Sequence, residues 1–235
     1  MTALKNIKFY ATQPHSCSYL ANKQATTLFM DPEKKLDAAL YSRLADIGFR
    51  RSGNHIYRPH CQGCRACIPA RIPVAEFSMT RCQKRTWKKN QDLEVICQDP
   101  TMNTELYTLY EHYINTQHKD GDMFPPSVEQ FNGFLVDSPD FSCFYQFRLE
   151  GQLVAVAVTD TLKDSLSAIY TFYHPDFRQR SLGRFCILWQ IMHARLLGKQ
   201  YVHLGYWVKG CRKMDYKTDY RPMEILIGNR WSRLR

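Results

Sequence analysis

The chain has 235 residues, of which 44% are hydrophobic and 13% aromatic, enough to bury the core of one large domain or two small ones. No apolar stretch has the length of a signal peptide or a membrane span, so we expect a cytoplasmic protein with no membrane partner. The formal charge of +10 is concentrated in segments 40–90 and 171–235, a pattern that suits a polyanion partner or simply a basic, solvated surface.

The N-terminal third predicts one helix and one hairpin. The segment "DPEKKLDAALYSRLADIG" is typical of a helix in which Asp31 is the N-cap, Pro32 takes the first helical position and Gly48 ends it. Arg50 and Arg51 follow directly, before a Ser-Gly-Asn turn and a short extended segment. These two arginines are therefore expected on short, well-anchored backbone.

A cysteine-rich segment, "YRPHCQGCRAC", comes next, and prolines beside it predict irregular structure over residues 61–73. It contains three cysteines at two-residue gaps, Cys61, Cys64 and Cys67. A tetrahedral metal site needs a fourth ligand, and Cys17 is the obvious supplier, with His15 or His60 as substitutes. Four thiolates suit either zinc or an iron–sulfur cluster, and a metal-free, thiol-rich loop is the alternative.

The other cysteines are expected to be ordinary thiols: Cys82, Cys97, Cys143, Cys186 and Cys211. The basic stretch 78–90 follows the cysteine-rich segment. Residues 104–118 predict a helix, and Ser127 with Gln130 forms a capping-box start for another.

From residue 141 the hydrophobic period changes to that of strands. The remaining predicted elements are strands 141–150, 153–162 and 165–175, a helix over 181–198 and a strand over 201–207. This order is an antiparallel meander followed by a strand-helix-strand crossover. The predicted fold class is α+β: a GNAT-like acyltransferase domain with a mixed, mostly antiparallel sheet and flanking helices, plus a smaller Cys-containing N-terminal domain. We place the boundary so that residues 1–95 and 96–235 form the two domains.

The turn before the last predicted helix is similar to the coenzyme A phosphate-binding turn of GNAT-type acyltransferases, whose pattern is [R/Q]-x-x-G-x-[G/A]. In the segment from Arg180 to Phe185 the first glycine, Gly183, is kept, but Phe185 replaces the final small residue. A phenylalanine there is expected to crowd a pyrophosphate, which argues against a plain acetyl-coenzyme A enzyme.

Four segments in one order carry a more specific resemblance. They are "HSCSYLANKQATTLFMDP", "YSRLADIGFRRSGNHIYRPHCQGCRACIPARIPV", "TFYHPDFRQRSLG" and "YVHLGYWVKGCRKMDYKTDYRPMEIL". Together they resemble the aminoacyl-tRNA–protein transferase family, and within it the bacterial aspartate/glutamate leucyltransferases. The resemblance implies transfer of leucine from leucyl-tRNA to the α-amino group of proteins that begin with Asp or Glu, which marks them for ATP-dependent degradation.

The implied reaction is aminolysis of an activated ester, so no cofactor is required for the chemistry. The α-amino group has a reference pKa of about 7.7–8.0, so a substantial neutral fraction exists without a strong base. Positioning therefore supplies much of the rate, and no Ser-His-Asp arrangement is expected. The candidate catalytic residues stand at the two strand ends that flank the turn: Tyr170, Thr171 and Tyr206. Each has an ordinary alternative role as a residue of the sheet.

The implied substrates also predict binding residues. The acceptor carboxylate calls for a fixed cation, and the candidates are Arg50, Arg51 and Arg71. The candidates for tRNA binding are Arg178, Arg180, Gly183, Arg184, Trp207, Lys209 and Lys213. In eukaryotic family members an iron–sulfur cluster is associated with paired cysteine motifs, although here Ser18 stands beside Cys17, so the first motif has one thiol. The alternatives are an arginyl-tRNA–protein transferase, a GNAT-type acetyltransferase and a non-catalytic RNA-binding protein.

Overall fold

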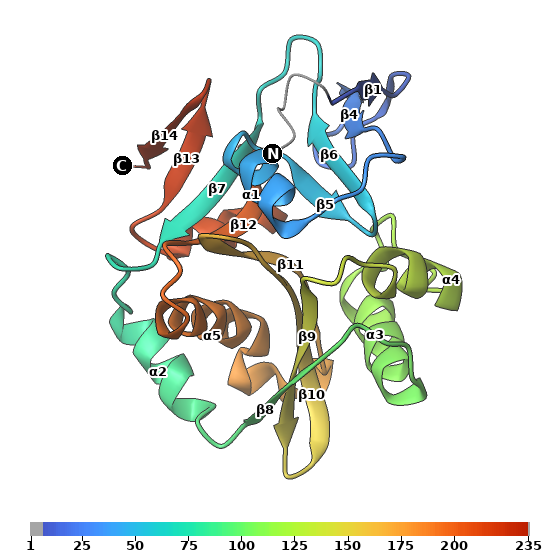
Figure 1. The fold of residues 1–235 in the computed structure, drawn as a ribbon. Helices are drawn as coiled ribbons and strands as arrows, with labels where there is room; N and C mark the ends of the chain where they lie inside the picture. Colours follow the sequence, from blue (N-terminus) through green and yellow to red (C-terminus); the bar gives the residue numbers. More distant parts are fainter. Residues whose placement is uncertain (1–6, 235) are drawn as a thin grey trace.

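The computed structural model describes residues 7–234, and its largest element is an eight-stranded sheet (Figure 1). The strands lie in the order β14-β13-β7-β12-β11-β10-β9-β8, and each neighbouring pair is antiparallel except β11 and β12, which are parallel. The strands are β7 (Cys67–Pro73), β8 (Glu94–Gln98), β9 (Ser142–Leu149), β10 (Gln152–Thr161), β11 (Ser165–Tyr173), β12 (Tyr201–Val208), β13 (Glu224–Ile227) and β14 (Arg230–Arg233).

Helices cover both faces of this sheet. The helical segments are α1 (Ala38–Asp46), α2 (Arg81–Lys89), α3 (Thr104–Gln117), α4 (Val128–Phe131), the π-helical η2 (Asn132–Val136), the 3-10 segments η3 (Pro175–Arg180) and η4 (Arg212–Asp219), and α5 (Leu182–Leu196). The protein is thus a mixed α+β fold with a large, mostly antiparallel sheet and flanking helices, which confirms the predicted class at this level.

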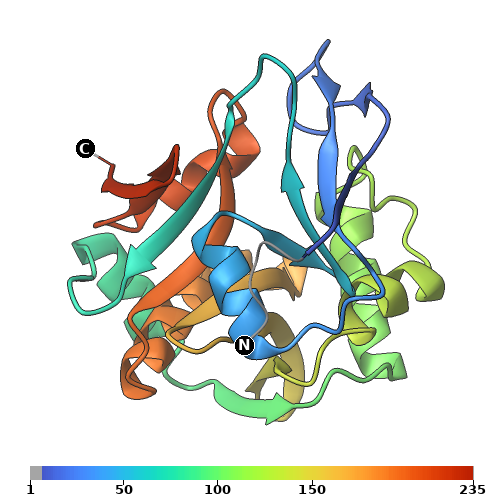
Figure 2. The same ribbon diagram turned by 45° about the horizontal axis from the view of Figure 1, so that its top comes forward.

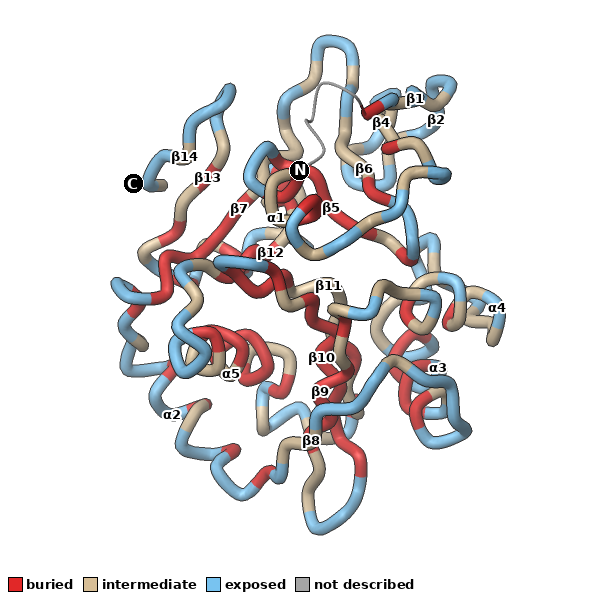
Figure 3. Tube along the Cα trace, in the orientation of Figure 1, coloured by how far each residue is buried: buried red, intermediate tan, exposed pale blue. Residues whose placement is uncertain are grey.

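Strand β10 shows how the core is divided. Side chains alternate along a strand, so Val156 and Val158 pack with α3 and α4, whereas Ala155 and Ala157 pack with α5. Figure 1 shows α5 beside α2 on one side of strands β9 to β11, with α3 and α4 on the other. Burial is concentrated in α5 and in the central strands (Figure 3).

The predicted meander and crossover over residues 141–207 are confirmed as β9, β10, β11, α5 and β12. Helix α3 also forms as predicted, and the Ser127 hydroxyl caps α4 by accepting the N–H of Gln130 at 3.1 Å. These elements have strong hydrophobic periods and clear turn residues, so local sequence was sufficient to find them.

Helix α1 begins at Ala38 rather than Pro32. The carboxylate of Asp37 accepts the N–H of Leu40 at 2.6 Å and is the N-cap, so the predicted cap at Asp31 is wrong. The Asp31 carboxylate instead accepts a backbone N–H inside a turn. The end of the helix before the glycine at position 48 is as predicted.

The irregular structure predicted over residues 61–73 is wrong for its second half, which is strand β7. Pro69 and Pro73 lie in this strand although proline has no N–H to donate. The structure accommodates these prolines because β13 pairs with β7 only at Ala70 and Arg71. Neither proline therefore has to donate a backbone hydrogen bond to β13. Helix α2 was also not predicted, because its charged sequence hid the capping box that Thr80 and Gln83 form.

The N-terminal region forms a four-stranded sheet of its own, in the order β1-β4-β6-β5. Its strands, with those of a two-stranded ribbon, are β1 (Phe9–Ala11), β4 (Thr27–Met30), β5 (Arg50–Ser52), β6 (His55–Pro59), β2 (His15–Ser16) and β3 (Gln24–Ala25). The predicted hairpin is β5 and β6. Helix α1 lies over the large sheet in both views (Figure 1; Figure 2), and the hydroxyls of Tyr41 and Ser167 are 3.5 Å apart.

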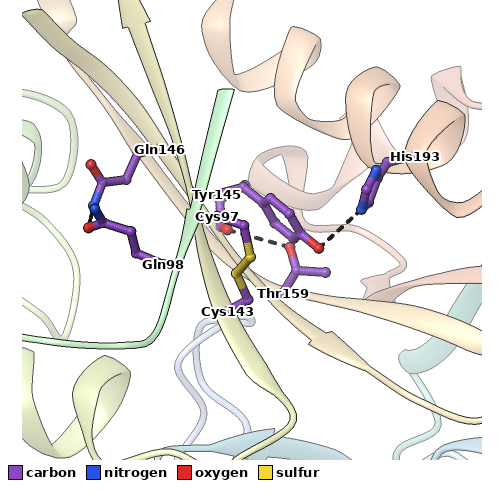
Figure 4. Close-up of a disulfide and its surroundings, with 8 residues drawn as sticks. Cys97, Gln98, Cys143, Tyr145, Gln146, Thr159 and His193 are labelled. Atoms are coloured by element: carbon purple, nitrogen blue, oxygen red, sulfur yellow. Dashed lines mark hydrogen bonds between the residues drawn. A yellow bond between two sulfur atoms is a disulfide. The ribbon is translucent and has the colours of Figure 1, made fainter. Parts of the chain in front are cut away.

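A disulfide joins Cys97 of β8 to Cys143 of β9, with Cα atoms 6.4 Å apart (Figure 4). The expectation that both are ordinary thiols is wrong, because antiparallel pairing of β8 with β9 brings together two cysteines separated by 46 residues. Beside the disulfide, Gln146 donates to the side-chain oxygen of Gln98 at 2.7 Å. The edge strand β8 is thus tied covalently and by side chains to its neighbour.

Strand β7 and helix α2 come from the N-terminal third of the chain but belong to the large sheet and its helical layer. The division into residues 1–95 and 96–235 therefore stays a prediction, with β7 crossing between the two parts. Within residues 7–234, no helix is both long and apolar enough to cross a membrane.

Candidate active site between two diverging strands

The parallel strands β11 and β12 separate partway along their length. They pair only where Ser165–Ser167 meets Tyr201–His203, after which β12 continues beside β7 and β11 beside β10. Residues 168–171 of β11 are half-buried, although the nearby Leu166 and Phe172 are fully buried. The divergence therefore makes part of a central strand accessible from outside the sheet.

Arg50 of β5 reaches the point of divergence. Its Nη1 donates to the hydroxyl of Ser167 at 2.8 Å, and its Nη2 donates to the carbonyl oxygen of Ala168 at 2.6 Å. The residue is only 6% exposed, and no ion pair within residues 7–234 includes it. Burying a cation against neutral acceptors is unfavourable, so Arg50 is a candidate for binding an anion.

The side chain of Lys217, in η4, also lies near the point where β11 and β12 diverge, and it is bonded to β12. Its ammonium donates to the carbonyl oxygen of Tyr206 at 2.5 Å, and the residue is 5% exposed. Gly205 has a φ of +79°, and a Cβ placed on it would lie 3.4 Å from Nε of Arg50 and 3.6 Å from Nζ of Lys217. Burial, and next the Arg50 guanidinium, lower the pKa of Lys217 to about 7. Lys217 was not among the predicted site residues.

Two of the three predicted catalytic residues lie on the same side of the sheet as Arg50. Tyr170 pairs with Val158 and Ser167 with Asp160, so Tyr170 and Ser167 share a face, whereas Thr171 points to the opposite one. The hydroxyl of Tyr206 donates to the carbonyl of Gly48 at 2.8 Å, and burial raises its pKa well above the usual value. Tyr206 therefore connects β12 to the N-terminal region, while Tyr170 stands half-buried at the divergence.

The other two predicted acceptor-binding arginines already have carboxylate partners. Arg51 makes two bonds of 2.7 Å to the carboxylate of Asp160, and both side chains are fully buried. Arg71 lies 2.8 Å from Glu224, with its guanidinium 4.2 Å from the ring centre of Trp231. Both guanidinium groups are therefore neutralised inside the protein, whereas that of Arg50 has no carboxylate partner among residues 7–234.

Two residues at the start of α5, Gly183 and Phe185, each have a packing role. A Cβ on Gly183 would lie 2.9 Å from the ring of Tyr173, so this ring can pack against the helix start only over a glycine. Phe185 points into the core, with its ring centre 5.5 Å from that of Trp87 and 5.7 Å from that of Phe147. The expectation that Phe185 crowds this turn is therefore wrong, and it no longer argues against an acyl-coenzyme A.

The arginines around this turn differ in their surroundings. Arg180 makes two bonds of 2.8 Å to Asp92, Arg184 lies 3.0 Å from Asp219, and Arg178 is exposed. A hollow of about 330 Å³ lies beside them, lined by Cys82, Arg85, Thr86, Lys89, Gln179 and Arg180. Helix α2 thus adds two basic side chains to the predicted phosphate-binding region, which its charged sequence alone could have suggested.

The remaining predicted tRNA-binding residues lie after β12 or at its end. Trp207 is half-buried against the core on the α5 side, and its indole N–H is buried with no hydrogen-bond partner among residues 7–234. Lys209 is exposed, and Lys213 forms an exposed 2.7 Å ion pair with Asp120. The two lysines are available at the surface, whereas Trp207 is mainly a core residue.

The predicted metal-binding cysteines gather near the start of β7. Burial, and next the nearby thiols of Cys17, Cys61, Cys64 and Cys211, raise the pKa of Cys67 to about 12. Within residues 7–234 no three of these sulfur atoms all lie within 4.8 Å of one another, a longer separation than a zinc site with Zn–S bonds of about 2.3 Å allows. The donor set suits a thiolate-bound metal or cluster, although a closed zinc site is not formed. Cys211, expected to be incidental, belongs to this group.

Solved structures share this fold at low sequence identity. The C-terminal domain of a candidate lysylphosphatidylglycerol synthetase from Agrobacterium fabrum has a TM-score of 0.51 and 14% identity, over 83% of this chain and 62% of that one. The protein L-PGS from Bacillus licheniformis has a TM-score of 0.50 and 10% identity, over 80% of this chain and 65% of that one. These likenesses concern the fold alone.

Sequence comparisons are more specific. The family described as "Arginine-tRNA-protein transferase" matches through its N-terminal model over residues 15–85 and through its C-terminal model over residues 105–227. Proteins named aspartate/glutamate leucyltransferase from Pseudomonas aeruginosa and Stutzerimonas stutzeri are 59% and 60% identical over 231 residues, covering 98% of each chain. The chain therefore belongs to the arginine-tRNA-protein transferase family and is an aminoacyltransferase, as its sequence motifs predicted.

Proposed function

We propose that this enzyme transfers leucine from leucyl-tRNA to the α-amino group of proteins whose first residue is Asp or Glu. The observation that carries the proposal is the 59–60% identity, over 98% of each chain, to relatives named aspartate/glutamate leucyltransferase. The buried, unpaired cation of Arg50 supports it, because an acidic acceptor side chain needs such a partner.

The reaction requires little beyond positioning. The lone pair of the acceptor amine attacks the ester carbonyl, and the bond between this carbon and the tRNA ribose oxygen breaks. The proton that the amine loses ends on the ribose oxygen, which leaves as a hydroxyl group. The neutral fraction of an amine with a pKa of about 7.7–8.0 suffices as nucleophile. We assign Tyr170, half-buried at the divergence, to holding the aminoacyl ester, whereas the predicted Thr171 points to the opposite face of β11 and is assigned to the sheet. Tyr206 is assigned a positioning role, since its hydroxyl and carbonyl both make bonds within the protein.

The acceptor carboxylate is assigned to Arg50. Its two neutral partners on β11 fix its position and leave the remaining N–H groups for an incoming carboxylate. Arg51 and Arg71 are assigned to supporting this region, because their own carboxylate partners occupy them. This division of roles predicts that substitutions at the three positions have different consequences.

The donor tRNA is assigned to the basic surface around the start of α5. It comprises the predicted residues Arg178, Arg180, Gly183, Arg184, Trp207, Lys209 and Lys213, together with Arg85 and Lys89 of α2. Gly183 and Trp207 act through packing, since both contact the core. The exposed cations supply phosphate contacts, which account for affinity without reading sequence.

The large sheet with its diverging parallel pair suits a GNAT-like domain, and the cysteine-containing N-terminal region suits a smaller domain that carries a structural metal. Cys17, Cys61, Cys64 and Cys67 would hold zinc or an iron–sulfur cluster, which would supply folding energy. We also propose that the enzyme is cytoplasmic. The leucine that it adds becomes the new N-terminal residue and marks the acceptor protein for degradation.

The proposal is tested with purified protein, radiolabelled leucyl-tRNA and a model protein that begins with Asp. Label should become acid-precipitable, and only when the acceptor amine is free. Arginyl-tRNA is assayed in parallel because the matching family is described by arginine, and acetyl-coenzyme A because Phe185 does not crowd the turn. Incorporation from arginyl-tRNA or acetyl-coenzyme A alone would replace the proposed donor.

A further inference from the structure

We infer that Lys217 is a specificity-determining residue that binds the acceptor's side-chain carboxylate together with Arg50. The inference rests on the proposed function, since it names a second cation in the same acceptor site. It assigns a role to a buried lysine that the aminolysis itself does not require.

The charge around the divergence is unbalanced. Arg51 has Asp160 and Arg71 has Glu224 as carboxylate partners, so these buried or half-buried cations are neutralised. In the part of the chain that the structure describes, neither Arg50 nor Lys217 takes part in an ion pair, although both are at least nine-tenths buried. The other groups that favour the charged form of Lys217 are the thiols of Cys211 and Cys67, and neither is a carboxylate, so an external carboxylate is a suitable partner for the two cations.

The two cations are aimed at one place. Nε and Nη2 of Arg50 and Nζ of Lys217 all lie within 3.6 Å of the position that a Cβ on Gly205 would occupy. Arg50 uses two of its five N–H donors on β11, and Lys217 uses one of its three on β12. The unused donors, on side chains anchored to β11 and to β12, match the several lone pairs of a carboxylate.

Residues adjacent to the two cations are partly exposed. Tyr216, the residue before Lys217, is 47% exposed, and residues 168–171 of β11 are half-buried. A glycine at position 205 leaves the backbone of β12 bare where the two cations meet. We therefore place the entry of a short acidic side chain on the Tyr216 side, where partly exposed residues adjoin the two buried cations.

A lysine in this position also accounts for acceptance of both Asp and Glu. Two bonds to β11 fix the guanidinium of Arg50, whereas a single bond to a carbonyl holds the Lys217 ammonium on its flexible stem. The ammonium can follow a carboxylate displaced by one methylene.

The experiment compares Lys217→Met, which keeps the length and removes the charge, with Lys217→Arg and with a matched control at an exposed lysine, Lys163→Met. Leucyl transfer is measured with peptides that differ only in a first residue of Asp or Asn. The unmodified enzyme should favour Asp by about a hundredfold, the scale of one desolvated charge pair. Lys217→Met should reduce this ratio at least tenfold through the KM for the Asp peptide, with the KM for leucyl-tRNA unchanged. Lys217→Arg should retain most of the preference for Asp over Asn, and the control variant Lys163→Met should retain all of it.

Binding of the same peptides to the protein without tRNA provides a second readout that does not depend on transfer. Affinity for the Asp peptide should fall about tenfold in Lys217→Met, and affinity for the Asn peptide should change little. Retention of the full Asp-over-Asn ratio in both measurements would overturn the inference, as would an equal loss for both peptides or a raised KM for leucyl-tRNA. If the unmodified protein binds Asp peptides through Lys217 but transfers no leucine, the proposed function fails and this site stands.

Discussion

Two adjacent arginines in β5 have opposite environments. Arg51 is enclosed with Asp160 in a fully buried ion pair, whereas Arg50 meets only the hydroxyl and carbonyl of β11. Successive side chains of a strand point to opposite faces, so neighbours with the same chemistry can have different roles. In this protein both arginines connect the N-terminal region to the large sheet, and we propose that Arg50 also binds a substrate.

The structural role of Arg51 predicts a large effect on stability. Arg51→Met leaves the Asp160 carboxylate buried without a partner, so the free energy of unfolding should fall by about 3–5 kcal/mol. The double variant Arg51→Met with Asp160→Leu should recover most of this loss. Urea denaturation measures both, with Arg148→Met as the control, because its pair with the half-exposed Glu105 should contribute about 1 kcal/mol or less. Equal, small losses in all variants would contradict the assignment.

At the level of these residues the sequence predicted three acceptor arginines, with Arg50 and Arg51 ahead of Arg71, but it could not show which guanidinium lacks a carboxylate partner. The distinction depends on Asp160 and Glu224, which lie more than a hundred residues away along the chain. Lys217 was missed for a similar reason, since its burial depends on how η4 folds back over β12. Residues far away in the sequence decide which cation lacks a carboxylate partner. The basic segment alone therefore does not indicate which cation that is.

At the level of elements, prediction succeeded where the hydrophobic pattern was local. Strands β9 to β12 and helix α5 have clear periods and turns, and all were predicted. Strand β7 was missed because its prolines argue against a central strand, and α2 because charges hide its capping box. Both missed elements carry residues of the proposed sites, β7 through Cys67 and α2 through its basic face.

The basic face of α2 predicts a measurable electrostatic effect. Arg85→Ala and Arg178→Ala remove exposed cations beside the hollow at the start of α5. Each should lower the slope of log affinity for leucyl-tRNA against log salt by about one. Lys35→Ala, an exposed lysine in the loop before α1, should leave the slope unchanged. If both arginine variants keep the full slope and affinity, the tRNA binds elsewhere.

The cysteine group at the start of β7 predicts a bound metal. Protein purified anaerobically and without chelators should contain close to one zinc or one iron–sulfur cluster per chain. Cys61→Ser and Cys64→Ser should lose the metal and much of the stability, because binding energy becomes folding energy in a small irregular segment. Cys82→Ser, an exposed thiol outside the group, is the matched control for metal content. Absence of metal from the unmodified protein would remove the proposed site.

At the scale of the whole molecule, the large sheet organises the two substrates. Its diverging parallel pair lies between the N-terminal region, which contributes Arg50, and the basic surface around α5. The proposed acceptor site thus joins Arg50 of the N-terminal third to Lys217 of the C-terminal third, beside β11 and β12. The net charge of +10 is consistent with an anionic donor, and the conserved overall length among relatives covers both parts.

The central claim is that leucine is joined to an acidic N-terminus, and one competition measures it directly. The enzyme is given equal amounts of leucyl-tRNA and arginyl-tRNA with equal amounts of two proteins that differ only in a first residue of Asp or Asn. Intact-mass spectrometry identifies every product. We predict that the Asp protein gains one leucine while the Asn protein stays unmodified. A gain of arginine, or equal modification of both proteins, would contradict the account.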